Sequence, residues 1–469
     1  MVDVTMDKSL STRQKSTVRW YGDRSVYGVF RTKAKFCLIV YIQKVHCPGR
    51  ILYIKSHINY QMATPKRILI AGGGIAGPSC ALLLSRAGQQ VTIVERAPQL
   101  RATGQQIDVA GNGVPIVKKM GIWEALKERT VGDEGIRFVT ENDQSWADFP
   151  ASKESSANSF VKEIEILRGD MVDVIYQRTK DNTECIFGDQ ISALTDHGSH
   201  VTASFEHHPD RDFDIVIAAD GLYSHTRSLV FGKDSAHIRS LNQCVALMSI
   251  PWQKSDTTWS RWCNAPGGRC ACTRPRAKQG LTGAYLALMT EESGKIGRMP
   301  AEEQKQEFAR RFADMGWETP RILEQMMKAD DFYVTPVAQA KPESWVKGRV
   351  ALLGDSGYAP SPVSGQGTTL ALVGAYILAG CINTYDDVQE ALKQYQQQVK
   401  PFVQEGQKLY PGVPGSANPQ TAWGIWTFYS IMWIASLINR SGVLGTLSVL
   451  FWPLSALFGS GLQLPEYRL

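Results

Sequence analysis

The chain has 469 residues, 43 % of them hydrophobic and 20 % charged, which is typical of a globular protein of two or three domains and excludes a disordered or fibrous one. Its net charge of +6 comes from residues 1–61, which hold 11 Lys and Arg against three Asp; the rest has 40 basic and 42 acidic residues. We therefore expect no nucleic-acid partner. Nine cysteines without a Cys-x-x-Cys pair and eight histidines without a His-x-x-x-His pair favour reduced intracellular thiols and no metal site.

Residues 1–61 allow two interpretations. A basic segment almost free of acidic residues is typical of a targeting sequence, but its apolar run 36–42 is short and far from the start. Alternatively, the functional protein starts at Met62, because Met-Ala-Thr-Pro-Lys-Arg directly precedes the first buried strand. We favour the second interpretation, in which residues 1–61 are an extension outside the fold.

Regular patterning begins at residue 67. Arg67–Ala71 is a short apolar run bounded by glycines, as expected for a buried parallel strand. Ile75–Ala87 has helical periodicity and is stopped by Gly88, and Gln90–Glu95 is a second strand. Together they predict a βαβ unit of a parallel sheet.

A glycine-rich turn joins the first strand to this helix. Gly72 permits the tight turn, Gly74 lets the backbone approach a pyrophosphate, and Gly77 lets helix and strand pack closely. The helix N-terminus offers amides and a partial positive charge to phosphates. Glu95 ends the second strand, 18 residues after Gly77, where it can accept hydrogen bonds from a ribose diol. An acid here argues against a 2′-phosphate, which leaves FAD or NAD.

The remaining pattern predicts a discontinuous cofactor domain. We expect strands at 163–167, 214–219 and 349–353 and helices at 170–179 and 367–382. Residues from about 236 to 335 alternate as in Gln243–Ile250 and Leu281–Leu288, which indicates a mostly antiparallel sheet. The predicted fold class is α/β, or α+β overall: a Rossmann-type domain with a parallel sheet (62–235 and 340–410), an inserted antiparallel-sheet substrate domain (236–339) and an apolar helical C-terminal segment (411–469).

The C-terminal segment leaves several alternatives open. Ala422–Ile438 and Gly442–Leu462 are apolar, with Asn439-Arg440-Ser441 between them, and 17 residues are at the lower limit for crossing a bilayer. The segment is either a helical pair packed on the body, a peripheral membrane contact, or a hairpin through the membrane. Five aromatic residues in Trp423–Trp433 resemble an interfacial belt. We therefore expect a cytoplasmic protein, with membrane contact through 422–462 left open.

Two further motifs decide the nucleotide. Residues 218–227, Ala-Ala-Asp-Gly-Leu-Tyr-Ser-His-Thr-Arg, resemble the Asp-Gly fingerprint of aromatic-hydroxylase flavoproteins. Residues 354–367, from Gly354-Asp355 to Gly365-Gln-Gly367, resemble the second FAD motif of the same proteins. With the glycine turn, the three motifs stand in the family's order, so the chain resembles single-component (group A) FAD-dependent monooxygenases of the p-hydroxybenzoate hydroxylase type from Lys66 to about Glu405. Fungal secondary metabolism is the setting that the resemblance favours.

The resemblance implies a set of FAD-binding residues. Glu95 would hold the adenosine ribose, Arg101 would lie near the flavin with the backbone around Val109, and Arg168 would contact FAD from a helix start. Asp355 would bind the ribityl chain, and Asp220 would stabilise its loop, which the family also ties to the nicotinamide cofactor. The full cofactor-binding set is Gly72, Gly74, Gly77, Glu95, Arg101, Val109, Arg168, Asp220, Asp355, Gly365, Gly367 and Thr368.

The second FAD motif departs from the family pattern at several positions. The common Asp-Ala-Ala-His reads Asp355-Ser356-Gly357-Tyr358, and Thr369 stands where many members have Asn. Tyr358 and Ser361 would lie near the point where substrate meets flavin, so Tyr358 either hydrogen-bonds substrate or packs. Trp259, Trp262 and Tyr285 are candidate pocket walls, although core packing is the simpler interpretation.

The resemblance also implies the reaction. NADPH or NADH reduces FAD, O₂ adds to form a flavin C4a-hydroperoxide, and its distal oxygen attacks an electron-rich carbon of an aromatic, polyketide or terpenoid substrate. The protein supplies position and a dry pocket, so no nucleophile–base pair is required and no catalytic side chain is assigned. Hydroxylation, epoxidation and lactone formation all remain open. The expected role is a tailoring step of secondary metabolism.

The sequence disfavours other functions that occur on the same fold. A flavin-dependent halogenase would carry a Trp-x-Trp-x-Ile-Pro segment, and Trp423-Gly-Ile-Trp426 has the wrong spacing. A disulfide reductase among the flavin dehydrogenases would need a cysteine pair, whereas Cys80 stands alone. A non-catalytic binder, similar to the proteins that chaperone prenylated GTPases, is disfavoured because Asp355 and Gly365-Gln366-Gly367 are retained.

Overall fold

The computed structural model describes residues 65–100, 104–132, 134–151, 164–440, 462–467 and 469, and the backbone of 26–31 and 37–42. Arg101 and residues 441–461 thus lie outside the described residues. The chain divides into two units, Met1–Pro65 and Lys66–Leu469. In the first unit, β1 (Val26–Arg31) pairs antiparallel with β2 (Cys37–Ile42). That residues 1–61 are dispensable for the fold stays a prediction.

The second unit is built around a six-stranded sheet in the order β19-β20-β13-β3-β4-β9, parallel except for β19. Its strands are β3 (Arg67–Ala71), β4 (Gln90–Glu95), β9 (Glu184–Phe187), β13 (Ile215–Ala218), β19 (Val346–Lys347) and β20 (Val350–Leu352). The expected bounds of β3 and β4 are confirmed. Because β3 and its neighbours are covered on both faces, their sequences are continuous apolar runs without alternation.

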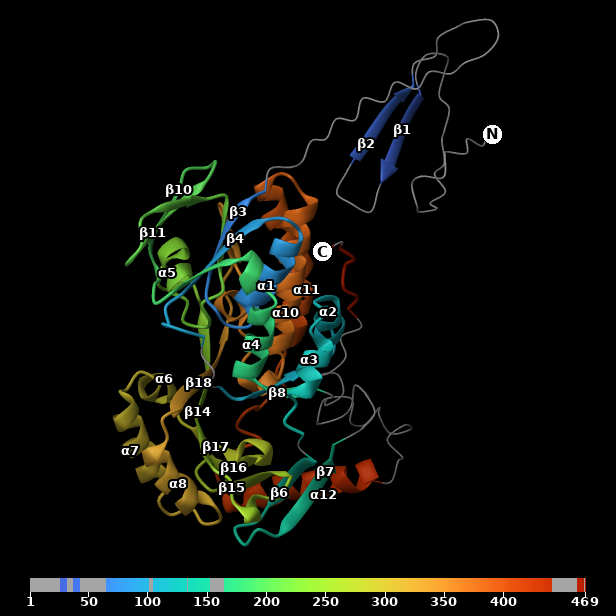
Figure 1. The fold of residues 1–469 in the computed structure, drawn as a ribbon. Coiled ribbons are helices and arrows are strands. Elements are labelled where there is room, and N and C mark those ends of the chain that lie inside the picture. The colour runs from blue at the N-terminus through green and yellow to red at the C-terminus, as the bar shows by residue number, and fades with distance from the viewer. Residues whose placement is uncertain are drawn as a thin grey trace, which may run out of the picture. The chain divides into compact units, whose positions relative to one another are not determined.

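The two faces of this sheet are covered differently (Figure 1). Ile68 and Ile70 face a helical layer, whereas Leu69 and Ala71 face a small sheet. The helical layer consists of α1 (Ala76–Arg86), α4 (Arg168–Gln177), α10 (Gly367–Thr384) and α11 (Val388–Gly406), with the short helices α2 (Gly113–Lys119) and α3 (Trp123–Glu128) beside it. The small sheet consists of β10 (Ile191–Asp196), β11 (Val201–Phe205) and β12 (Arg211–Phe213). This confirms a mixed α/β fold.

The unit contains a second, seven-stranded sheet, in the order β18-β14-β17-β16-β15-β6-β7. It is antiparallel except for the parallel pair β15–β6. The strands are β6 (Gly135–Val139), β7 (Ser145–Pro150), β14 (Ile238–Pro251), β15 (Ser260–Ala265), β16 (Arg269–Arg276), β17 (Leu281–Met289) and β18 (Tyr333–Ala340). The sheet therefore includes residues 135–150, which the sequence placed in the cofactor domain, so its boundary at residue 236 needs correction.

Helices cover one face of the seven-stranded sheet. Phe308 and Phe312 of α7 (Ala301–Phe312) and Ile322 and Met326 of α8 (Thr319–Lys328) share a core with β14–β17, beside the short α6 (Ser293–Ile296). These helices were not expected from the alternating sequence. A two-stranded sheet of β5 (Gln106–Val109) and β8 (Ile164–Leu167) lies in the connection between the two large sheets.

The C-terminal helix α12 (Ala422–Arg440) packs on β7 and β15 (Figure 1). Its Tyr429 is 4 % exposed; the hydroxyl accepts from the Asn264 amide at 3.0 Å and donates to the Val139 carbonyl at 3.1 Å. Tertiary packing therefore accounts for one face of this helix. Within the part of the chain that the structure describes, one helix, α10, is long and apolar enough to cross a bilayer, and 78 % of it is buried in the cofactor-domain core.

Candidate functional site

Three turns meet at one edge of the six-stranded sheet. Ala71 of β3 pairs with Ala218 of β13, and Ala218 pairs with Leu352 of β20, so these neighbouring parallel strands end level with one another. The glycine turn, the Asp-Gly turn and the Gly-Asp turn follow directly after them. The carboxyl ends of parallel strands are where α/β sheets bind ligands. The structure thus brings together all three sequence motifs.

The glycine turn requires glycine for steric reasons. Gly72 has φ +113°, and its amide donates to the Val94 carbonyl at 2.8 Å. A Cβ at Gly72 would collide with the carbonyl of Ala219, and one at Gly77 would collide with the carbonyl of Gly72. Gly74 is different, because the single atom near its added Cβ is Arg168 Nη2, at 3.1 Å. The tight turn and the close helix–strand packing expected of Gly72 and Gly77 are therefore observed.

Glu95, at the end of β4, stabilises the glycine turn by hydrogen bonds. Its Oε2 accepts from the Gly73 amide at 2.7 Å, and its Oε1 accepts from the Ala97 amide at 2.9 Å. Each carboxylate oxygen can accept a second hydrogen bond. Glu95 is therefore held in one orientation beside the glycine turn, with acceptor capacity left for a ligand.

The Asp-Gly turn is stabilised internally, as expected for Asp220. Its carboxylate accepts from the Ser224 hydroxyl and, at 2.9 Å, from the Thr226 amide, which orders the start of α5 (His225–Phe231). Arg227, 3 % exposed, then donates to the carbonyls of Leu222 and Ser356. Burial lowers the pKa of Arg227, and Asp220 opposes that shift. Arg227 ends the Asp-Gly motif, and no local sequence pattern indicates this role.

Arg168 and Asp355 face the same space. Arg168 begins α4, its amide bonded to the Gln105 carbonyl at 3.0 Å, and its side chain passes Gly74 and Gly104. Asp355 begins α9 (Asp355–Tyr358), and its exposed carboxylate has no hydrogen-bond partner among the described residues. Although the side chain reaches solvent, the protein packed around it raises the pKa of Asp355, and the charge of Arg168 opposes this. Asp355 is thus an acceptor group left open beside a cation.

The glycines of the turn before α10 are accessible, whereas several side chains near this turn are buried. A Cβ added at Gly365 or Gly367 would meet no atom within 4 Å, so the backbone there is accessible to a ligand. Thr368 is 8 % exposed. Thr369, where the family has Asn, donates its hydroxyl to the Ala110 carbonyl at 3.2 Å. Val109 is 1 % exposed in the core, so only its backbone can contribute to a site.

Tyr358 needs correction as a candidate substrate contact. Its side chain is fully buried, and its hydroxyl lies 3.0 Å from that of Tyr395, which itself donates to the Leu352 carbonyl at 2.7 Å. Trp345 packs edge-on against its ring. Tyr358 is therefore a core residue of the α9–α11 contact, which is the packing alternative from the sequence.

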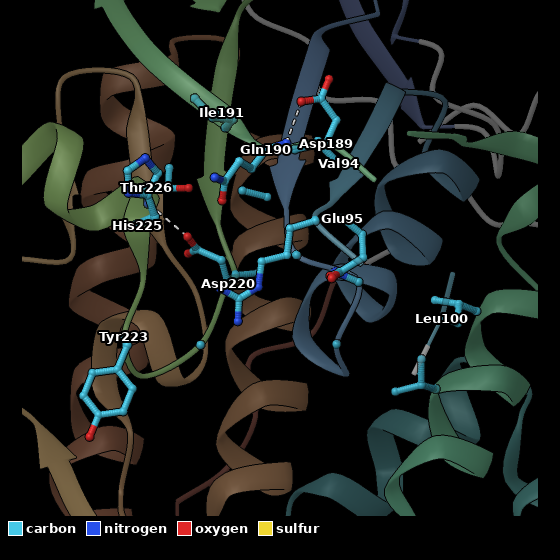
Figure 2. A pocket seen from close by; sticks show the side chains of 18 of the residues that line it. Val94, Glu95, Leu100, Asp189, Gln190, Ile191, Asp220, Tyr223, His225 and Thr226 are labelled. Atoms are coloured by element: carbon cyan, nitrogen blue, oxygen red, sulfur yellow. Dashed lines mark hydrogen bonds between the residues drawn. The ribbon is translucent and has the colours of Figure 1, made fainter. Parts of the chain in front are cut away.

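A pocket opens between the glycine turn and the Asp-Gly turn (Figure 2), and no residue of the motif 354–367 lines it. It is lined by Gly72, Gly74, Glu95, Arg168 and Asp220, as expected, and by residues to which the sequence assigned no role: Gly73, Arg96, Asp189, Gln190, Ile191, Tyr223, His225 and Thr226. Asp189 accepts from the His208 ring at 2.6 Å and from the amides of Gln190, Glu206 and His207. Since residues 188–190 join β9 to β10 without any motif, the sequence held no signal for Asp189 and Gln190.

The chain matches the FAD binding domain family over residues 66–407. It is 33 % identical over 403 residues to the FAD-dependent monooxygenase asL6 of Sarocladium schorii, covering 81 % of this chain and 95 % of that protein. It is 35 % identical over 386 residues to the monooxygenase CTB7 of Cercospora beticola, covering 78 % of this chain and 92 % of that protein.

Solved structures share the fold. The tetracycline destructase Tet(55) superimposes with a TM-score of 0.70 at 31 % identity, over 86 % of this chain and 99 % of that one. Klebsiella pneumoniae HpxO complexed with FAD and uric acid has a TM-score of 0.65 at 18 % identity, over 81 % and 97 % of the two chains, and it supports the fold alone.

Proposed function

This chain belongs to the FAD-binding-domain family of flavoprotein monooxygenases, and we propose from that premise how its residues hold FAD and prepare a small organic substrate for oxygenation. It is an FAD-dependent monooxygenase that uses NADPH or NADH and O₂, with relatives in fungal secondary metabolism. The observation that carries the assignment to the site is the meeting of the turns after β3, β13 and β20 at one edge of the sheet, where the first two of them line a pocket.

The polar groups of the site suit FAD from end to end. Glu95 has acceptor capacity for the adenosine ribose, and the amides at the start of α1 face phosphates without a side chain in the way at Gly74. The open carboxylate of Asp355 suits the hydroxyls of the ribityl chain, and Arg168 beside it suits an anionic oxygen. The accessible backbone at Gly365–Gly367 suits polar edges of a flat ring.

The bound FAD supplies the oxygen chemistry, and the protein supplies binding and environment. The β5–β8 sheet and the seven-stranded sheet meet beside Arg168, where Tyr285 accepts from the Gln106 amide at 3.4 Å. This hydrogen bond joins the β5–β8 sheet to the seven-stranded sheet near the start of α4. Arg101 and the backbone near Val109 remain proposed contributors to FAD binding, on the resemblance alone.

The assignment is tested on the purified protein. We expect a yellow protein with flavin absorbance that oxidises NADPH, and that consumes O₂ faster when its substrate is added from a panel of phenols, polyketides and terpenoids. A colourless protein that fails to take up added FAD contradicts the proposal.

Glu95 provides a sharper test. Glu95→Gln keeps one side-chain acceptor but loses the charge and one amide contact, so we expect the dissociation constant for FAD to rise by about tenfold. FAD fluorescence on release measures this, with Glu124→Gln on the exposed side of α3 as the matched control. Equal FAD retention in both variants means that Glu95 does not hold the ribose.

A cytoplasmic location and a peripheral membrane contact are further proposals. The seven cysteines in the described residues are all free, as in a reducing compartment. The membrane proposal rests on α12 alone, whose outer face exposes Trp423 at 74 %, Trp426 at 56 % and Trp433 at 49 %. Cosedimentation with phosphatidylcholine vesicles tests it. Unchanged partitioning of a Trp423→Ser/Trp426→Ser/Trp433→Ser variant means that α12 has no membrane role.

A further inference from the structure

Exposed large hydrophobic side chains are concentrated on α12. Twelve such side chains are exposed in the described part of the chain, and half of them lie on this one helix: Trp423, Trp426, Ile431, Trp433, Ile434 and Leu437. The other six are scattered over separate elements. Single exposed hydrophobic residues are ordinary on a soluble protein, whereas a contiguous apolar patch marks an interaction site. The outer face of α12 is such a patch.

The helix α12 is apolar on both of its faces. Tyr429 and Ser436, 4 % and 3 % exposed, lie on the inner face, which packs on β7 and β15. The only charged residue of α12 is Arg440, at its C-terminal end. A surface helix of a soluble protein normally has charged and polar residues on the face that points away from the core. The outer face of α12 is therefore not adapted to water.

Hydroxyl groups on α12 are satisfied within the helix. Thr427 donates its hydroxyl to the Trp423 carbonyl at 2.9 Å. Ser430 donates to the Trp426 carbonyl at 2.8 Å. Because these hydrogens bond back to the preceding turn, they are not available to water or to a polar partner. In hydrocarbon, every polar group must be satisfied in this internal way. The hydrogen bonds of α12 thus suit a lipid environment.

The sequence beyond α12 favours a lipid surface over a protein partner. Residues 441–461, which lie outside the described residues, contain no charged side chain, so Arg440 is the single charged residue between Ala422 and Gly461. A protein–protein interface has a polar rim around its apolar centre. Tryptophans on a nearly uncharged stretch are instead typical of the interface between a membrane and water.

The seven-stranded sheet connects α12 to the cofactor domain. Phe428 of α12 contacts Phe138 of β6 edge-on, with ring centroids 5.6 Å apart. Phe138 pairs with Trp262 of β15, and the same register continues through β16 to Tyr285 of β17. Directly paired residues share a face of a sheet. The Tyr285 hydroxyl accepts from the Gln106 amide of β5. One face of the sheet therefore carries α12 at one end and the cofactor junction at the other.

We propose that α12 docks the enzyme on a lipid surface, where the seven-stranded sheet receives a lipophilic substrate dissolved in the bilayer, such as a long-chain phenol or a terpenoid. This inference rests on the proposed function, because the substrate is the molecule that the flavin site oxygenates. It narrows the substrate class from small organic molecules in general to those that partition into membranes.

The test compares lipophilic and water-soluble compounds that have the same reacting group. Pentadecylresorcinol is set against orcinol, and farnesol against prenol, at equal total concentrations with the FAD-loaded protein and phosphatidylcholine vesicles. We expect kcat/KM for substrate-stimulated NADPH oxidation to be about tenfold or more higher for at least one long-chain compound than for its short partner. If neither long-chain compound is preferred, the proposal is wrong, while FAD uptake and basal NADPH oxidation report separately on the monooxygenase assignment.

Variants link the preference to α12. Trp423→Ser/Trp426→Ser/Trp433→Ser should abolish it, while FAD content and thermal stability stay as in wild type because all three side chains lie on the exposed face. The matched control is Trp252→Ser, a similarly exposed tryptophan directly after β14, which should keep the preference. A long-chain preference that survives in the triple variant overturns the proposal. A wild-type dimer that the triple variant converts to a monomer also overturns it, because α12 would then be a subunit interface.

Discussion

The buried guanidinium of Arg227 donates to the main-chain carbonyl of Ser356, 129 residues further along the chain. A second donor of the same side chain bonds to the Leu222 carbonyl at 2.8 Å. Ser356 in turn donates its hydroxyl to the carbonyls of Ala218 and Leu353. One arginine and one serine thereby lock the Asp-Gly turn to the turn that carries Asp355.

Arg227→Lys is expected to loosen this connection. A lysine cannot reach both carbonyls in the fixed fork of a guanidinium, so we expect a loss of about 2 kcal/mol in the free energy of unfolding. Urea denaturation measures the loss, and FAD affinity should fall with it because Asp220 and Asp355 are no longer held together. The exposed Arg178→Lys serves as control. Unchanged stability in Arg227→Lys contradicts the bracing role.

Gly72→Ala should prevent FAD binding. The substitution combines a strained φ of +113° with a collision against the Ala219 carbonyl, so the glycine turn must move away from the Asp-Gly turn. We expect a protein that purifies without visible flavin absorbance. Gly88→Ala is the matched control, because Gly88 also has a positive φ, +82°, but open space around it. If both variants retain FAD equally, the close approach at Gly72 is not required.

Asp189 should make stability depend on pH in the acid range. Burial would raise the pKa of Asp189, but hydrogen bonds from His208 and from three backbone amides outweigh burial and lower it. A lowered folded-state pKa means that the carboxylate stabilises the fold above about pH 4, its ordinary value, and that this contribution is lost as the pH falls through the lowered pKa.

Asp189→Asn removes that dependence. We expect the variant to be about 2 kcal/mol less stable than wild type at pH 7, and the difference to shrink as the pH falls below about 4. Thermal unfolding from pH 7 to pH 3 measures this, with the exposed Asp181→Asn as control. A difference that stays constant over this range would show that ionisation of Asp189 does not stabilise the fold.

Tyr358→Phe separates a core role from a substrate role. Because the Tyr395 hydroxyl donates to Leu352, Tyr358 is the donor in the tyrosine pair, and its loss should cost about 1 kcal/mol of unfolding free energy. We expect kcat/KM to stay within about twofold of wild type once FAD is bound. A tenfold fall in kcat/KM at unchanged stability would restore Tyr358 as a substrate contact.

Prediction from sequence succeeded where local requirements dominate. β3 and β4 were predicted to the residue, because a central parallel strand buried on both faces is an uninterrupted apolar run. It failed for β6 and β7, which join a sheet whose other strands lie between Ile238 and Ala340. A domain defined as one continuous stretch of sequence cannot include a strand that pairs with strands so far along the chain.

The sequence by itself determined the three turns, their order and the family that they resemble. A positive φ, a close backbone approach and an acid at a strand end are each requirements on a single residue, so a local pattern reveals them. What surrounds a side chain was decided by tertiary structure. Tyr358 turned out to be buried in the core, and Arg276, which resembles any strand arginine in sequence, is buried with its Nε unpaired among the described residues. Both outcomes depend on segments brought together by long-range packing, and no local pattern records which partner such a side chain will meet.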